Sequence, residues 1–316
     1  MSAPMVLTRE NYFSPEANRL FMSNSQYGNW KKCAAKQFAI ENEIYEEVDD
    51  KNHFIGGRYA HTAVLLPEEL EQFEIDNPSV KKTLERSVKD WKDLGAKLGV
   101  DLKGKMKSRD TMREAIVDAG HEIPPEPRVF ESKFAWIETA LEGYERQQVF
   151  VDCIDKGKSE IIYTFQLGGI WWKCMIDNLR IQDNQFDDLK FMADFKEKWD
   201  NKKKRYVQWF EVYDYERQSA LYQFGIKENE NVLLTPNIFG LSKQKPSMPS
   251  WIQFTDQQHL DGRIKEVEEN LVNILAWKSG ERPAPRCEQP DCDFCRATAV
   301  IERPLRPTYS YAPTYY

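Results

Sequence analysis

The sequence predicts an α/β (α+β) fold in which helices flank a central mixed β-sheet. Between residues 149 and 191, short runs rich in β-branched and aromatic residues follow one another, as is typical of strands. Long segments with apolar residues at helical spacing precede and follow these runs. Elements in this order pack as layers around one sheet, and 41% hydrophobic residues in a chain of 316 can fill its core.

The first predicted helix follows a short lead within residues 7–39. Ser23 or Ser25 can cap it, because a serine hydroxyl accepts a hydrogen bond from the first turn. Four residues recur along it at helical spacing: Tyr27, Trp30, Ala34 and Phe38. An acidic connector over residues 41–50 leads into Gly56-Gly57, and a second helix is expected from Tyr59 to near Pro67.

Residues 68–130 are polar, charged and mostly helical in pattern, and a proline cluster at 124–127 marks a subdomain seam. An amphipathic helix is predicted over residues 132–148. Four strands follow, over residues 149–154, 159–167, 169–179 and 186–191. The pattern then predicts a helix over 206–225, strands over 231–239 and 251–254, and a helix over 256–278.

Two carboxylates and a lysine coincide on two of these strands. Asp177 lies near the end of an apolar run, and Asp188-Leu189-Lys190 follows. Since side chains alternate along a strand, Asp188 and Lys190 share a face, whereas Asp187 faces away, so Asp188 is preferred over its neighbour. Carboxylates can hold Mg²⁺ and a lysine can orient or deprotonate a water. Solvated charges at strand ends are the alternative.

Composition excludes several classes of protein. The sequence lacks both a run of 18 apolar residues and a basic N-terminal region followed by an apolar stretch. We therefore expect neither a membrane span nor a secretory signal, and a cytoplasmic location, in a bacterial host cell if the protein is phage-encoded. The net charge of −7 argues against coating nucleic acid with the whole surface, but allows a focused basic groove.

The order of motifs resembles the PD-(D/E)xK nucleases, specifically the phage and prophage RecE-like exonuclease branch related to lambda exonuclease and to the RecB and AddB nuclease domains. The motifs are Met22-Ser23-Asn24-Ser25-Gln26-Tyr27, Gly57-Arg58-Tyr59-Ala60-His61, Asp177, Asp188-Leu189-Lys190 and Gln218-Ser219-Ala220-Leu221-Tyr222. The Pro-Asp of the family is here Ile176-Asp177.

This resemblance implies a restriction-endonuclease-like core and a role for each motif. Asp177 and Asp188 would bind Mg²⁺ or Mn²⁺, with His61 as an additional ligand and Lys190 as the residue that activates water. Gln218 and Tyr222 would line the DNA. Apart from the resemblance, His61 could equally be a histidine at the start of a helix with its hydrogen bonds satisfied. Gln218 and Tyr222 are four residues apart and could equally form a half-buried helix face.

A basic run follows the last catalytic motif, and Trp199 and Tyr206 are interleaved with it. Lysines beside aromatic residues can hold a DNA backbone, so Lys202 and Lys203 are candidate DNA-binding residues. A solvated linker before a helix would have the same pattern.

The resemblance further implies the activity and the division of the chain. We expect a Mg²⁺-dependent exonuclease acting on double-stranded DNA ends in phage recombination, with a single-strand annealing recombinase as partner and a homo-oligomeric ring as assembly. The alternatives are a catalytically silent DNA-binding or assembly module and a structure-specific endonuclease. The expected units are an N-terminal helical part of the nuclease domain, a helical insertion, the nuclease core and a cysteine-containing tail, over residues 1–67, 68–130, 131–280 and 281–316.

Three cysteines near the C-terminus, Cys287, Cys292 and Cys295, have a spacing suited to metal ligation. A fourth ligand is needed. Cys33 is the candidate, because a cysteine on the first helix with a distant C-terminal triplet resembles the iron–sulfur clasp of AddB-type and CRISPR-adaptation nucleases. The four cysteines could hold a 4Fe-4S cluster or a zinc ion, or they could be free thiols. Cys153 and Cys174 lie in apolar runs and are expected in the core.

Overall fold

A five-stranded mixed sheet forms the centre of the computed structural model, which describes residues 3–46, 51–102, 108–200 and 203–300. The strands lie in the order β3 (Lys158–Leu167), β4 (Ile170–Arg180), β5 (Gln185–Met192), β8 (Thr235–Ser242) and β9 (Pro249–Gln253). Only β5 and β8 are parallel; the other neighbours are antiparallel. The predicted α/β fold with a mixed sheet is therefore confirmed.

The hairpin of β3 and β4 is set by its turn. Gly168 and Gly169 both have positive φ, +60° and +80°, the conformation that a two-residue hairpin turn requires and that glycine adopts without strain. The register then runs from Leu167 opposite Ile170 to Lys158 opposite Leu179.

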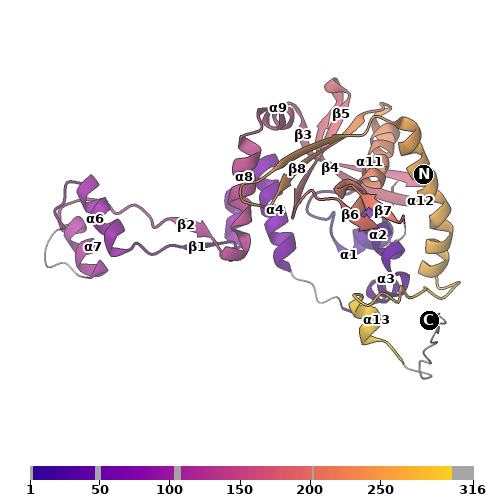
Figure 1. Ribbon diagram of the computed structural model, residues 1–316, viewed down its shortest axis with the longest axis horizontal. Helices are drawn as coiled ribbons and strands as arrows, with labels where there is room; N and C mark the ends of the chain where they lie inside the picture. The colour runs from indigo at the N-terminus through magenta and orange to yellow at the C-terminus, as the bar shows by residue number, and fades with distance from the viewer. Residues whose placement is uncertain (1–2, 47–50, 103–107, 201–202, 301–316) are drawn as a thin grey trace, which may run out of the picture.

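Helices cover both faces of the sheet (Figure 1). On one face, α2 (Asn24–Lys32), α11 (Tyr215–Glu230) and α12 (Gln257–Lys278) share a core with β3 and β4, which includes Trp30, Trp172, Ile176, Leu221 and Leu271. On the other face, α4 (Lys51–Leu65), α8 (Trp136–Glu145) and α9 (Gln148–Lys156) pack on a core that includes Leu65, Phe150, Leu189 and Phe239. The sheet is thus buried between two helical layers.

The predicted strand over residues 149–154 is wrong, because these residues belong to α9. Phe150 and Ile154 are four residues apart and both buried, so they form one face of a helix against the sheet. The β-branched residues Val149, Val151 and Ile154 favoured a strand by propensity, but the tertiary contact decides.

The single helix predicted at the N-terminus is two helices. Ser23 caps α2 in a reciprocal capping box with Gln26, and the helix ends at Cys33, whose backbone is extended with φ −155°. A second helix, α3 (Ala34–Glu41), begins immediately. The break directs Cys33 away from both helix axes, toward the C-terminal segment described below.

Two other predicted helices have different bounds. The region expected to be one helix over 206–225 contains three elements: the strand β7 (Arg205–Val207), the helix α10 (Trp209–Val212) and α11. Between α10 and α11, Asp214 has the left-handed conformation with φ 57°. The helix expected from Tyr59 begins eight residues earlier, as α4 includes Gly56-Gly57. Gly56 is needed there, because a Cβ would lie 3.0 Å from Trp136.

The described residues of 81–102 and 108–130 project from the body as an arm (Figure 1). Its stalk is an antiparallel ribbon of β1 (Lys81–Thr83) and β2 (Arg128–Phe130), which the mostly helical prediction did not include. Its tip is α6 (Val88–Lys97) and α7 (Arg109–Asp118), packed around Trp91, Leu102, Met112 and Ile116. The predicted division of the chain into four units stays a prediction, and the tail beyond residue 300 lies outside the described residues.

The remaining elements are short: α1 (Pro15–Leu20), η1 (Pro67–Glu69), α5 (Leu70–Asp76), η2 (Ser132–Phe134), η3 (Ile181–Asp183), β6 (Lys198–Asp200) and α13 (Asp293–Ala297). A search of the described residues finds no helix with the length and apolar character needed to cross a membrane.

Candidate active site

The strands β4 and β5 separate where the predicted site residues lie. Their ladder holds only three residue pairs, from Arg180 opposite Gln185 to Asn178 opposite Asp187. At the next position, the side chain of Asp177 replaces the ladder, because its Oδ2 accepts a hydrogen bond of 2.8 Å from the backbone N–H of Leu189. Beyond this point β5 continues alongside β8 alone. We call the place where the two strands stop pairing, at Asp177 and Leu189, the gap between β4 and β5.

Four elements bring their side chains to this gap. From β5, Lys190 Nζ lies 2.6 Å from Asp188 Oδ2, since the two residues share one face of the strand. From α4, Nδ1 of His61 lies 3.6 Å from Asp177 Oδ2 on β4. From α11, Nε2 of Gln218 donates a 2.7 Å hydrogen bond to Asp188 Oδ1. Residues spread over the chain from 61 to 218 therefore surround one point.

Burial sets the charges at this point. It raises the pKa of Asp177 and of Asp188 to about 6, although the Lys190 ammonium opposes the shift. It lowers the pKa of His61 to about 4, and the same ammonium adds to the effect. Burial also opposes the charge on Lys190, but Asp188 and Asp177 outweigh it and hold its pKa above the ordinary value. At neutral pH the imidazole is neutral and the two carboxylates exceed the single ammonium.

The residues present fit a divalent cation. Asp188 Oδ2 is buried, and no well-aligned hydrogen-bond donor among the described residues satisfies it, although Lys190 lies beside it as an ion pair. Two carboxylates offer the hard oxygen ligands that Mg²⁺ and Mn²⁺ prefer, and a neutral imidazole can add a nitrogen ligand. The net negative charge of the group would attract such an ion.

Asp187 lies on the opposite face of β5, in a buried polar network. Its carboxylate accepts hydrogen bonds from Arg180 Nε at 2.7 Å and Nη2 at 2.8 Å. Asn178 and Asn237 donate to it at 2.8 and 3.0 Å. Both oxygens are thus occupied within the protein, which leaves Asp188 as the carboxylate directed at the gap.

The residues predicted to line DNA lie in different surroundings. Gln218 is buried and engaged with Asp188. Tyr222 is partly buried against the core, and burial raises its pKa well above the ordinary value. Lys203 forms a 3.0 Å ion pair with Glu211, and Lys202 lies outside the described residues.

Sequence reasoning missed two residues beside the site. Tyr215 precedes Gln218 by one helical turn, and Lys190 Nζ lies 5.2 Å from the centre of its ring. Glu160 has the left-handed φ of 52°, rare for a residue with a side chain, and its carboxylate forms a 2.6 Å ion pair with Arg9. The hairpin register could have indicated Glu160, since Ser159 and Ile161 pair with Asn178 and Ile176, the neighbours of Asp177.

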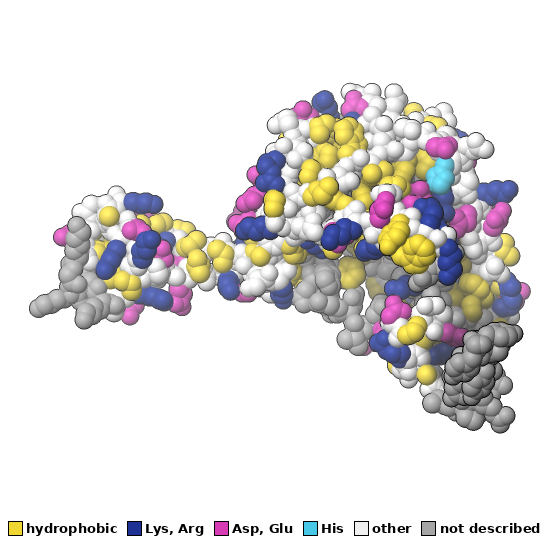
Figure 2. Space-filling view, in the orientation of Figure 1, with side chains coloured by type: hydrophobic (Ala, Val, Ile, Leu, Met, Phe, Trp, Pro, Cys, Tyr) yellow, Lys and Arg dark blue, Asp and Glu magenta, His cyan; other side chains and the backbone are white. Residues whose placement is uncertain are grey.

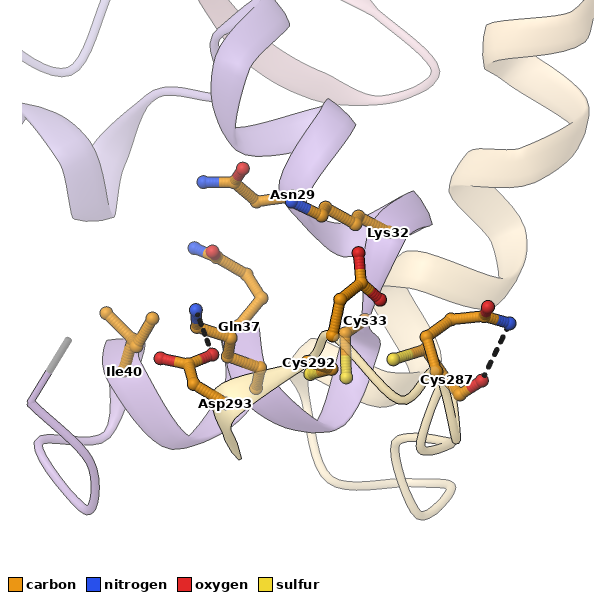
Figure 3. Close-up of a pocket in the computed structure, with 11 residues that line it drawn as sticks. Asn29, Lys32, Cys33, Gln37, Ile40, Cys287, Cys292 and Asp293 are labelled. Carbon is orange, nitrogen blue, oxygen red and sulfur yellow. Dashed lines mark hydrogen bonds and ion pairs between the residues drawn. The ribbon is translucent and has the colours of Figure 1, made fainter. Parts of the chain in front are cut away.

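The four candidate cysteines lie together, at a pocket between α3 and the C-terminal segment (Figure 3). Cys33 and Cys287 each place Sγ 3.7 Å from Sγ of Cys295, and all four sulfur atoms lie within 4.8 Å of one another. With Zn–S bonds of about 2.3 Å, the edge of a sulfur tetrahedron measures about 3.8 Å. A 4Fe-4S cluster holds the thiolates further apart, because its iron and sulfide atoms lie between them.

Contacts around the four cysteines tie the C-terminal segment to the N-terminal helices. The backbone N–H of Ala35 donates to Pro285 at 3.0 Å, and Asp293 accepts hydrogen bonds of 2.8 Å from Lys36 and Tyr45. The other two cysteines pack in the two cores of the sheet, as expected: Cys174 is buried and Cys153 partly buried.

Comparison with known proteins places the chain. A family model described as a PDDEXK-like domain of unknown function (DUF3799) matches residues 23–298. The chain belongs to this family. The resemblance to the PD-(D/E)xK superfamily is thereby confirmed, and the matched range holds the separated strands as well as the four cysteines.

A solved structure also resembles this PDDEXK-like chain. It is a protein of Eubacterium rectale, provisionally described as an exonuclease, with 26% sequence identity and a TM-score of 0.70. The match covers 96% of this chain and 97% of that one, so it spans nearly the whole of both. A search of curated proteins finds no match.

Proposed function

We propose that this protein is a metal-dependent deoxyribonuclease that hydrolyses phosphodiester bonds at DNA ends. One observation carries the proposal: Asp177, Asp188, Lys190 and His61 converge at the gap between β4 and β5, with a buried Asp188 oxygen directed into it. Family membership and the likeness to the Eubacterium rectale protein support the same activity. A divalent cation at the two carboxylates and a phosphate beside Lys190 would account for these residue types at one point.

Asp177, Asp188 and His61 would hold Mg²⁺ or Mn²⁺, which when bound supplies Lewis-acid polarisation of a phosphate oxygen and of the attacking water. Lys190 is protonated under the influence of both carboxylates. It would therefore donate a hydrogen bond to the water or to the phosphate and stabilise the negative charge that develops there. Gln218 fixes the orientation of Asp188 through its hydrogen bond. In the hydrolysis, a bond forms between the water oxygen and phosphorus, and the bond between phosphorus and the leaving oxygen breaks. The water loses one proton and the leaving oxygen gains one.

The activity is tested on linear and covalently closed circular duplex DNA with Mg²⁺, using wild type and Lys190→Ala. Degradation of the linear duplex alone, lost in the variant, is expected. Nicking of the circle would instead identify a structure-specific endonuclease. Binding without any cleavage would identify a catalytically silent DNA-binding or assembly module. A ring-shaped oligomer and a single-strand annealing recombinase as partner are finer parts of this proposal.

We further propose that the four cysteines bind one tetrahedral ion of the zinc class. The 3.7 Å sulfur separations match a single ion with four thiolate ligands more closely than a 4Fe-4S cluster. Elemental analysis of the purified protein tests this. One equivalent of zinc in a colourless protein is expected; iron with sulfide in a brown protein would show the cluster, and neither metal would show free thiols.

A further inference from the structure

Aromatic side chains extend from the catalytic lysine toward the surface. Lys190 Nζ lies 5.2 Å from the centre of the Tyr215 ring. That ring stacks on Tyr213, with centres 5.7 Å apart and planes at 25°. Lys198 Nζ in turn lies 5.3 Å from the centre of the Tyr213 ring and 3.3 Å from its hydroxyl. A continuous row of rings and ammonium groups thus joins the proposed active site to strand β6.

The hairpin of β6 and β7 presents a second pair of rings. Trp199 and Tyr206 are directly opposite each other in its register, with ring centres 5.4 Å apart. Val207, the neighbour of Tyr206, is buried, so by strand alternation the two rings face away from the body. Trp199 is 52% and Tyr206 63% exposed. Figure 2 shows hydrophobic side chains over this hairpin with Lys and Arg side chains around them.

The charge beside these rings is positive. Lys203 and Arg205 form ion pairs with the same carboxylate, that of Glu211, at 3.0 and 2.6 Å. Asp200 also lies near Arg205, but the described residues between 198 and 211 hold four cations against two carboxylates, and the side chains of Lys203 and Arg205 are about half exposed. Lys198, one of the four cations, lies where the hairpin meets Tyr213. Aromatic rings next to an excess of cations are complementary to a nucleic acid with accessible base faces.

We propose that the β6–β7 hairpin, through Trp199 and Tyr206, is a stacking platform for the unpaired bases of the DNA strand that leads to the active site, and that Tyr213 and Tyr215 connect this platform to Lys190. This platform rests on the proposed nuclease function, and it specifies the substrate as a DNA end with a single-stranded segment. Bases in a duplex are stacked on one another, so only unpaired bases offer their faces to Trp199 and Tyr206. The cations beside the rings neutralise the phosphates of the same strand.

The experiment measures affinity without divalent cations, so that nothing is cleaved. Fluorescence anisotropy is followed with a labelled single-stranded oligonucleotide and with a blunt duplex of the same length. The double variant Trp199→Ala/Tyr206→Ala is compared with wild type, with Tyr206→Phe and with Phe54→Ala, which alters another exposed aromatic residue, 61% exposed on α4. Because the rings face solvent, melting temperatures should stay close to wild type.

The double variant should bind the single strand at least roughly tenfold more weakly, because stacking of one base on an aromatic ring changes the affinity by about this factor. Duplex affinity should change less, and Tyr206→Phe should bind as wild type because stacking needs the ring and not the hydroxyl. Unchanged single-strand affinity of the double variant would overturn the platform, as would an equal loss in Tyr206→Phe or Phe54→Ala.

Cleavage by wild type with Mg²⁺ is measured separately, so the two proposals can fail independently. Cleavage with unchanged binding by the double variant would refute the platform and keep the nuclease. No cleavage with the expected loss of binding would refute the nuclease and keep the platform as a single-strand binding surface.

Discussion

The adjacent aspartates Asp187 and Asp188 on β5 lie in different environments, because side chains alternate between the two faces of a strand. Asp188 faces the gap beside Lys190, whereas Asp187 is held by Arg180 and two asparagines in the interior. Asp188 lies beside groups that could bind a cation and a phosphate. Asp187 neutralises Arg180 and accepts hydrogen bonds from the two asparagines. Only the first arrangement suits catalysis.

Alanine at each position should therefore have a different effect. Asp188→Ala should lower the cleavage rate by roughly 10²-fold or more, and its loss of stability should be smaller than that of Asp187→Ala, because Asp177 remains near Lys190 and burial opposes the Asp188 charge. Asp187→Ala removes the buried partner of the Arg180 guanidinium and leaves it the more exposed Asp183, and it should cost about 3 kcal/mol of unfolding free energy. Urea denaturation and cleavage rates measured on the same preparations check this. Equal stability of the two variants would refute the assignment.

The raised carboxylate pKa values also predict how pH changes the stability of the metal-free protein. In the unfolded chain an aspartate ionises near its ordinary pKa of 3.8, but Asp177 and Asp188 ionise near 6 in the folded protein. Their contribution to stability is complete below the unfolded value and is lost as pH rises through about 6. His61, with its pKa lowered to about 4, acts in the opposite sense.

Bound Mg²⁺ should offset the loss, because it stabilises the charged carboxylates. The increase in melting temperature on adding Mg²⁺ should be larger near neutral pH than at about pH 5, where protons compete with the metal. Thermal melts with and without added Mg²⁺ measure it, in buffer without a chelator so that any metal at the cysteines stays bound. The variant Asp177→Asn/Asp188→Asn is the control, and it should lose the Mg²⁺ effect at every pH. A metal effect that is largest in acid would contradict the site.

At the scale of elements, the sequence predicted the strands that carry the site because two patterns agree there. Apolar runs mark β3, β4 and β5, and the two glycines between β3 and β4 define the turn, so strand alternation was enough to place Asp188 and Lys190 on one face. The gap between β4 and β5 was not predictable, since it depends on the Asp177 side chain replacing a backbone hydrogen bond.

Helix boundaries failed where tertiary contacts override local propensity. In α9, the spacing of Phe150 and Ile154 allowed a helix, but the valines and isoleucine favoured a strand. At Cys33 the helical spacing of apolar residues continues through the break, and only contact with a distant segment explains it. The hairpin of β6 and β7 was hidden because charged residues dominate its sequence.

The contacts at Cys33 predict that the cysteine site stabilises the fold without taking part in catalysis. Cys292→Ala should lower the unfolding free energy by at least about 2 kcal/mol through loss of a metal ligand, with normal activity per folded molecule. Urea denaturation and metal content are measured, with Cys153→Ala, a thiol outside the cluster, as the matched control. A catalytic defect in a variant of normal stability would contradict this role.

On the scale of the whole molecule, the arm and the body have separate cores. The apolar residues that surround Trp91, Met112 and Ile116 all lie between residues 91 and 123. The arm joins the body through the β1–β2 ribbon, and beyond its last pair the Leu84 N–H donates to Pro127 at 2.8 Å. The two strands of the stalk are therefore close enough to be joined by a short turn between Leu84 and Pro127.

Replacing residues 85–126 with Asn-Gly should leave the body folded, because this dipeptide favours the tight turn of a two-residue hairpin. The melting temperature should remain within a few degrees of wild type, and the cysteine metal should remain bound. Circular dichroism and elemental analysis are the measurements, and cleavage of a short linear duplex then shows whether the arm is needed for activity. An unfolded product would show that the arm supports the core.

The cysteine clasp also has a consequence for how the protein is made. Cys33 leaves the ribosome early, and its partner Cys295 is synthesised 262 residues later. With the proposed metal site, the N-terminal helices would acquire their metal-bound form only after the ribosome has passed the C-terminal cysteines. A chain truncated before Cys287 would lack three of the four thiols, so a cell's quality-control proteases could distinguish incomplete copies from finished ones.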